Sequence, residues 1–209
     1  MSSTTFTPVF PKFTADEAVA RAQGAVGQGT YRLGGSQDHL KVMGLTTEFD
    51  CVGFACCWAY GLPRHQPGFN RGAWSTVEDD INSNSMAEDA IHRADLFQFV
   101  ASFVDHAHDA DDARPGDLLV YPTTRRMGIG HAAIIVTPAA RLQDLRIVQC
   151  VGPNGRRPAI LRSDASHFEL RRSQGVPVSI VRPRQRPTSS WIQPFDSDLA
   201  GLAQREVGA

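Results

Sequence analysis

The sequence predicts an α+β domain, because two helical patterns come before a series of short strands. A capping box, Thr14 with Glu17, precedes the first helical segment, and an apolar run from Cys51 to about Tyr60 forms the second. Four short apolar segments bounded by turn residues follow after position 113. Helices followed by consecutive strands favour layered α+β packing over alternating βαβ units.

The first 113 residues contain most of the predicted helix. Residues 1–13 are expected to be an extended arm, and the capping box starts a short helix that ends near a glycine. Beyond the Cys51 helix, residues 61–113 contain the capping boxes Ser75 with Glu78 and Ser85 with Glu88. The apolar residues from Leu96 to Val104 recur at helical spacing. We therefore expect residues 61–113 to form a helical insertion or lid.

The later part of the chain predicts strands. The four segments are "RPGDLLVYP", "HAAIIVTP", "RIVQCVGP" and "GVPVSIVRP". Each ends at turn residues, which limits it to strand length. Residues 183–209 are expected to be a linker rich in proline and arginine with a short helix. A chain of 209 residues with no internal repeat is expected to be one domain, residues 1–209.

Charge and hydropathy exclude some classes of partner. The net charge of -1 gives no basic field of the kind that nucleic-acid-binding proteins use, so no nucleic acid is expected. Residues 1–140 carry 10 basic against 16 acidic side chains (-6), and residues 141–209 carry 11 against 6 (+5). No apolar window is long enough to span a bilayer, and the first residues lack the pattern of a signal peptide. We expect synthesis in the cytoplasm and no transmembrane segment.

The four cysteines predict neither a disulfide framework nor a metal site. They include no CxxC pair, and no Cys/His spacing matches a structural zinc site, so no metal and no other cofactor is expected. On a helix, Cys56 and Cys57 lie roughly 140° and 240° around the axis from Cys51. We expect these two thiols to pack in the core.

Cys51 is different because it stands at the start of its helix. A helix N-terminus carries unpaired N–H groups and a partial positive charge, which lower the pKa of a thiol there. A nucleophilic thiol also needs a proton carrier, usually a histidine. His131 begins a predicted strand after a glycine-containing loop, where its side chain can face a cleft. The residues thus predict a Cys51–His131 pair, although a buried structural thiol would fit the same local pattern.

Four motifs in this order resemble a known family. "YRLGG", "FDCVGF", "RPGDLLVY" and "GHAAIIV" are similar to motifs of the NlpC-type cysteine peptidases, papain-like enzymes that cut bacterial cell-wall peptides. The resemblance covers residues 14–61 and 113–182. It implies that Cys51 is the nucleophile, on a helix packed against an antiparallel sheet, and that His131 is the general base.

The resemblance also implies further site residues. Tyr31 would lie near the oxyanion or the substrate, and Asp50 near the amine of the substrate or in the pocket wall. Asp50 could equally be only the N-cap of the helix. The residue that orients the histidine is most often another His in this family; Gln149 stands at that position here, with Asn154 as the alternative. A glutamine carbonyl can accept a hydrogen bond from the imidazole but supplies no charge.

The resemblance therefore predicts a cysteine peptidase that hydrolyses amide bonds in peptidoglycan stem peptides. Because peptidoglycan lies outside the cytoplasm, we expect non-classical delivery, as a secreted toxin or as a phage-type lysin, with a delivery or immunity protein as partner. Two alternatives stay open. One is an amidase or acyltransferase on another amide substrate, and the other is a non-catalytic module that binds the cell wall or a partner.

Overall fold

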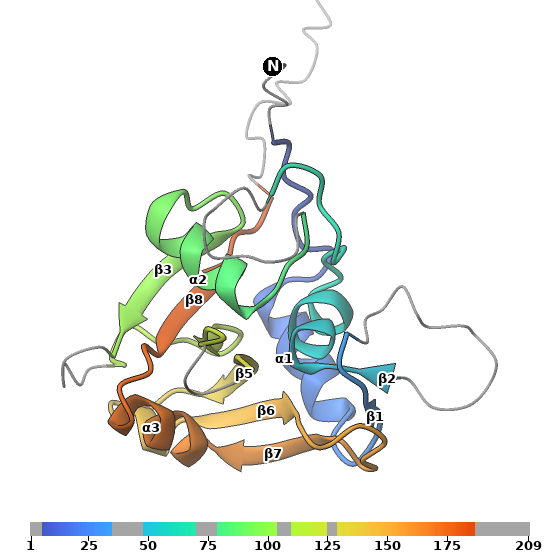
Figure 1. Cartoon of the computed structure of the whole chain (residues 1–209), viewed down its shortest axis with the longest axis vertical. Helices are drawn as coiled ribbons and strands as arrows, with labels where there is room; N and C mark the ends of the chain where they lie inside the picture. Colours follow the sequence, from blue (N-terminus) through green and yellow to red (C-terminus); the bar gives the residue numbers. More distant parts are fainter. Residues whose placement is uncertain (1–5, 35–47, 70–78, 104–109, 125–128, 187–209) are drawn as a thin grey trace, which may run out of the picture.

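A six-stranded sheet forms the centre of the protein in the computed structural model, which describes residues 6–34, 48–69, 79–103, 110–124 and 129–186 (Figure 1). In spatial order the strands are β3 (Phe97–Ser102), β8 (Ser179–Pro183), β4 (Leu118–Tyr121), β5 (His131–Thr137), β6 (Arg146–Cys150) and β7 (Ile160–Asp164). All neighbouring strands in this sheet are antiparallel. The predicted α+β class is confirmed, and so are the four strands β4, β5, β6 and β8.

The helices form where the sequence places caps and apolar runs. They are α1 (Ala15–Gly24), the π-helix η2 (Gly53–Ala59), α2 (Ser83–His92), the 3-10 turn η3 (Leu142–Asp144) and α3 (Ser166–Ser173). The Thr14–Glu17 capping box of α1 is present as predicted. A single α-helical turn at Cys51 and Val52 leads into η2, so the predicted helix from Cys51 is confirmed but wound more widely. A small parallel pair, β1 (Thr30–Tyr31) with β2 (Glu48–Phe49), precedes it.

The sheet is covered on both faces, each with its own buried cluster. The first cluster joins α1, η2 and α2 to one face and contains Cys51, Cys56 and Cys57. The second cluster joins α3 and η3 to the other face. In Figure 1, α1 lies to the right of the sheet and α3 at its lower left. The expected core positions of Cys56 and Cys57 are confirmed, since both side chains are buried.

The helix predicted over Leu96–Val104 is wrong, because Phe97–Ser102 is strand β3 at the edge of the sheet. The buried carboxylate of Asp89, in α2, accepts hydrogen bonds from the backbone N–H groups of Leu96 and Phe97, both at 2.8 Å. These bonds end the helical path, and the chain then pairs with β8. The expected insertion is therefore partly a strand of the central sheet.

The start of α2 also differs from the prediction. Asn82 is the N-cap, and its side chain and that of Ser85 form the capping box, so the helix begins three residues before the predicted Ser85–Glu88 box. The predicted box of Ser75 with Glu78 lies outside the described residues, as do residues 1–5 of the arm and residues 187–209 of the C-terminal linker. Within the described residues, no helix is both long and apolar enough to cross a membrane.

Candidate active site

Asp50 fixes the start of the helix that carries Cys51. Its Oδ1 accepts the backbone N–H of Gly53 at 2.6 Å, which is an N-cap bond. Its Oδ2 accepts the N–H of Gly34 at 3.0 Å and pairs with Nη1 of Arg64 at 2.8 Å. The side chain is buried, and these bonds use both carboxylate oxygens. The N-cap role is therefore present in the structure, and a contact of Asp50 with substrate stays a prediction.

The Cys51 thiol lies beside the first residues of β5 and is 6% exposed. The backbone N–H groups of Ala132 and Val52 face the sulfur and favour the thiolate, but burial and the negative charge of Asp50 outweigh them. The pKa of Cys51 is thereby raised to about 12. Burial thus opposes the acidic thiol that the helix start predicts, because desolvation exceeds the effect of the helix N-terminus.

His131 owes its position to the glycine before it. At Gly130 an added Cβ would lie 2.2 Å from Oγ of Ser83 and 2.6 Å from the backbone of Thr123 and Tyr121. No side chain fits there, so only glycine can occupy position 130, where the chain passes between α2 and the end of β4 before it enters β5. His131 is buried at the first position of that strand, and burial lowers its pKa to about 4. The imidazole is therefore neutral near pH 7.

A chain of hydrogen bonds defines the tautomer of His131. The Ser163 hydroxyl donates to the carbonyl of Asp164 at 2.8 Å, and its oxygen accepts Nε2–H of Gln149 at 2.8 Å. The Gln149 amide therefore presents its Oε1 to Nε2 of His131, at 2.8 Å. An oxygen acceptor requires a proton on Nε2, which leaves Nδ1 of His131 as the proton acceptor.

The structure distinguishes between the two residues proposed to orient His131. Gln149 contacts the imidazole directly. The side-chain oxygen of Asn154 instead accepts the backbone N–H of Leu33 at 3.0 Å. Cys150 lies on the opposite face of β6 from Gln149, in the first buried cluster, as the predicted strand alternation requires.

Cys51 and His131 approach the start of β5 from different sides. Cys51 and Ala132 belong to the first buried cluster, whereas the ring of His131 lies 5.5 Å from that of Phe168, in the second. Within the described part of the chain, no hydrogen bond joins Cys51 to His131. The two side chains are thus near the same strand end without contact.

Tyr31 lies on the Cys51 side of the site. Burial raises the pKa of Tyr31 to about 12, and the charges of Cys51 and Asp50 add to this effect. Its half-buried hydroxyl is therefore within electrostatic reach of the thiol. This position is compatible with the predicted place near the substrate or the oxyanion.

A cleft of about 370 Å³ opens beside His131, and we call it the His131 cleft. Its polar and glycine lining consists of Tyr121, His131, Gln149, Gly152, Arg156 and His167. The Tyr121 hydroxyl and Nε2 of His167 are 2.9 Å apart, and the rings of His167 and His131 are 6.2 Å apart. The sequence analysis predicted none of Arg156, Ser163 and His167. Arg156 lies in the loop before β7, Ser163 in β7 and His167 in α3, and these segments have no strong sequence pattern. Only His167 carried a signal, its titratable side chain.

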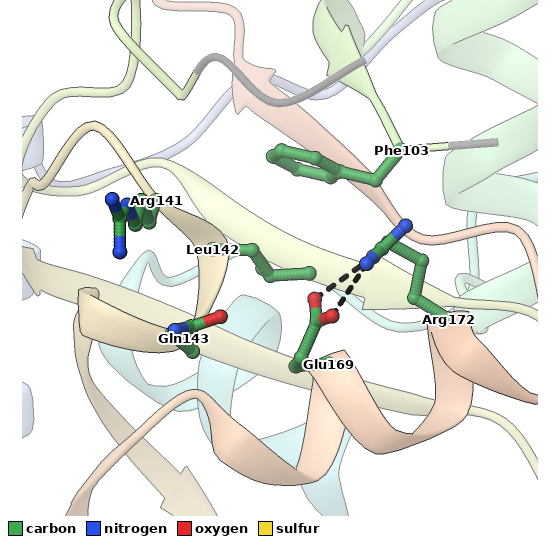
Figure 2. Close-up of a pocket in the computed structure, with 6 residues that line it drawn as sticks. All are labelled: Phe103, Arg141, Leu142, Gln143, Glu169 and Arg172. Atoms are coloured by element: carbon green, nitrogen blue, oxygen red, sulfur yellow. Dashed lines mark hydrogen bonds and ion pairs between the residues drawn. The ribbon is translucent and has the colours of Figure 1, made fainter. Parts of the chain in front are cut away.

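A second hollow, of about 250 Å³, lies on the other flank of α3 (Figure 2). Figure 2 shows Glu169 and Arg172 directed toward each other at its edge, where Nε of Arg172 donates to Glu169 at 2.8 Å. Its other lining residues are Phe103, Arg141, Leu142 and Gln143. Its described lining residues include neither a thiol nor an imidazole.

Among the described residues, no group of three His, Cys, Asp or Glu side chains is arranged to hold a metal ion.

Comparisons with known proteins give little beyond this geometry. The chain matches no family model and no curated protein. Among solved structures, one similar chain is described as the crystal structure of Ly7917, with a TM-score of 0.43 and 17% sequence identity. The match covers 82% of this chain and 63% of that chain, so this chain spans less than two thirds of the length of its structural neighbour.

Proposed function

We propose that the protein is a papain-like cysteine peptidase of the NlpC type, which hydrolyses amide bonds in peptidoglycan stem peptides. The observation that carries this proposal is the contact of Gln149 with Nε2 of His131 at 2.8 Å, which leaves Nδ1 as a base at the strand end where Cys51 lies. The order of the four sequence motifs supports the substrate class. Cys51, His131 and Gln149 would be the catalytic group.

The reaction would start from a neutral pair, because Cys51 has a raised pKa and His131 a lowered one. Substrate binding would bring the two side chains together at the start of β5. The thiol proton would pass to Nδ1 of His131 as the sulfur attacks the carbonyl carbon, and the imidazolium would then protonate the leaving amine. Water would release the acyl group from Cys51. Tyr31 and a backbone N–H at the helix start would stabilise the oxyanion.

A non-catalytic binding module is the second candidate, and the state of the thiol favours it. Cys51 is buried, has a pKa near 12 and forms no hydrogen bond to His131 in the described part of the chain. Such an unreactive thiol is expected in a protein that has lost catalytic activity. The His131 cleft would then bind a wall peptide without cutting it.

The proposed substrate lies outside the cytoplasm, so we propose that the protein reaches it as a secreted toxin or after phage-type lysis. A delivery protein or an immunity protein would be its partner. Presence in the medium of strains that lack both specialised secretion and lysis would contradict this route.

Digestion of purified peptidoglycan tests the function. Wild type, Cys51→Ala and Cys57→Ala would be incubated with walls of several types, and the released muropeptides identified by mass spectrometry. Cys57 is the matched control, since it is a second buried thiol on the same helix. We expect release by wild type and Cys57→Ala and none by Cys51→Ala. Equal release by all three would exclude Cys51 as nucleophile, and no release by folded wild type would favour the binding module.

A further inference from the structure

Arg156 stands on the loop between β6 and β7, which is tied to the Cys51 side of the site. The backbone N–H of Tyr31 donates to the carbonyl of Arg156 at 3.1 Å, and the N–H of Gly155 donates to the carbonyl of Tyr31 at 2.8 Å. Tyr31 in turn lies within electrostatic reach of Cys51. These two backbone bonds tie the loop that carries Arg156 to Tyr31.

The side chain of Arg156 packs over a glycine. At Gly152, which has a φ of +140°, an added Cβ would lie 2.2 Å from Cδ of Arg156. Only glycine combines this backbone conformation with space for the arginine stem. Arg156 also lines the cleft that contains His131 and Gln149.

Arg156 brings a permanent positive charge to the His131 cleft. Arg156 is exposed and forms no ion pair or side-chain hydrogen bond within the described part of the chain. The lining of the cleft includes no Asp or Glu among these residues. The cleft thus presents one permanent cation, with a planar fork of N–H donors, next to the neutral imidazole.

We propose that Arg156 binds a carboxylate of the substrate, so that the protein selects peptides with an acidic group near the bond that is cleaved. A guanidinium and a carboxylate form two parallel charged hydrogen bonds, which fix orientation as well as position. This inference rests on the proposed peptidase function and adds Arg156 as the residue that recognises an anionic group of the substrate.

Protection of Arg156 against phenylglyoxal tests binding in the wild-type protein. The probes are a synthetic peptidoglycan stem peptide with free carboxylates and its twin in which they are carboxamides. We expect the carboxylate peptide to slow modification of Arg156 about tenfold and the twin to have no effect, as mapped by peptide mass spectrometry. Arg162, an exposed arginine on β7, is the internal control and should react equally throughout. Equal modification of Arg156 with both peptides would overturn the inference.

Cleavage of the same two peptides separates this inference from the proposed function. For Arg156→Gln we expect kcat/KM to fall about tenfold on the carboxylate peptide and to stay unchanged on the twin, with partial retention in Arg156→Lys and no change in Arg162→Gln. Protection without cleavage by wild type would leave the anion site standing and reject the peptidase. If every variant cleaved the carboxylate peptide and its twin with equal kcat/KM, the anion site would be rejected and the peptidase function would stand.

Discussion

Nε2 of His131 lies 2.8 Å from Oε1 of Gln149, and this single contact sets which nitrogen of the histidine can accept a proton. An amide can be reversed end to end, so its orientation needs a further partner. Ser163 supplies it, because its hydroxyl proton is already donated to the carbonyl of Asp164 and its oxygen can only accept from the Gln149 amide. A residue on the edge strand β7 thus determines the state of the imidazole.

Ser163→Ala is expected to impair the enzyme without touching the reacting groups. Without the hydroxyl, the Gln149 amide can reverse and offer its NH2 to His131, which favours the wrong tautomer. We expect kcat to fall about fivefold with KM nearly unchanged, as measured by stem-peptide cleavage. Ser163→Thr retains the hydroxyl and should retain activity. A loss in kcat that is equal for Thr and Ala would indicate a packing effect instead.

Gln149→Glu should change the charge state of His131. A carboxylate at the position of the amide would stabilise the imidazolium, so the pKa of His131 should rise from about 4 toward or above its ordinary value. The measurement is an NMR titration of the His131 ring protons. Gln149→Leu is the opposite control: it leaves the buried Nε2–H without an acceptor and should cost about 1–3 kcal/mol of stability. An unchanged His131 titration in Gln149→Glu would show that the contact is absent in solution.

Local signals in the sequence predicted much of the fold. The capping box at Thr14 and the apolar strands ended by turn residues depend on neighbours within a few positions, so they can be identified without the tertiary structure. Strand β3 could not, because its apolar residues fit a helix equally well. Its state is decided by Asp89 and by the free edge of β8, both distant in sequence.

Some residues of the candidate site could be predicted from the sequence and others could not. Cys51, His131 and Gln149 stand within motifs, so their residue types and order were enough to select them. Arg156 and Ser163 enter the site only because β7 and the loop before it pack beside β6. The pKa of Cys51 was missed because burial and the position of Asp50 are properties of the folded chain.

His131 should make the stability of the protein depend on acid. Its pKa is about 4 in the folded state and about 6.5 when unfolded, so between these values only the unfolded chain binds the proton. The free energy of unfolding should therefore be highest above pH 6.5 and fall by up to about 3 kcal/mol as the pH drops to about 4. Urea unfolding of wild type and His131→Gln across this range measures the effect. The exposed His92, replaced by Gln, is the matched control and should leave the slope as in wild type. If the free energy of unfolding of His131→Gln changed with pH as in wild type, the pH dependence would come from other groups.

Asp50→Asn should make the Cys51 thiol more acidic. Asparagine is also a good N-cap, so the bond to the Gly53 N–H can persist while the negative charge beside the sulfur is removed. Arg64 then keeps its positive charge without the Asp50 carboxylate, which favours the thiolate further. In wild type, alkylation of Cys51 by iodoacetamide should rise with pH up to at least pH 10 without a plateau, because the pKa is about 12. In Asp50→Asn the curve should shift to lower pH, and in Asp144→Asn, an exposed carboxylate away from the site, it should not. If the alkylation rate of wild type reached a plateau below pH 8, the Cys51 thiol would be acidic, as its position at the helix start predicts.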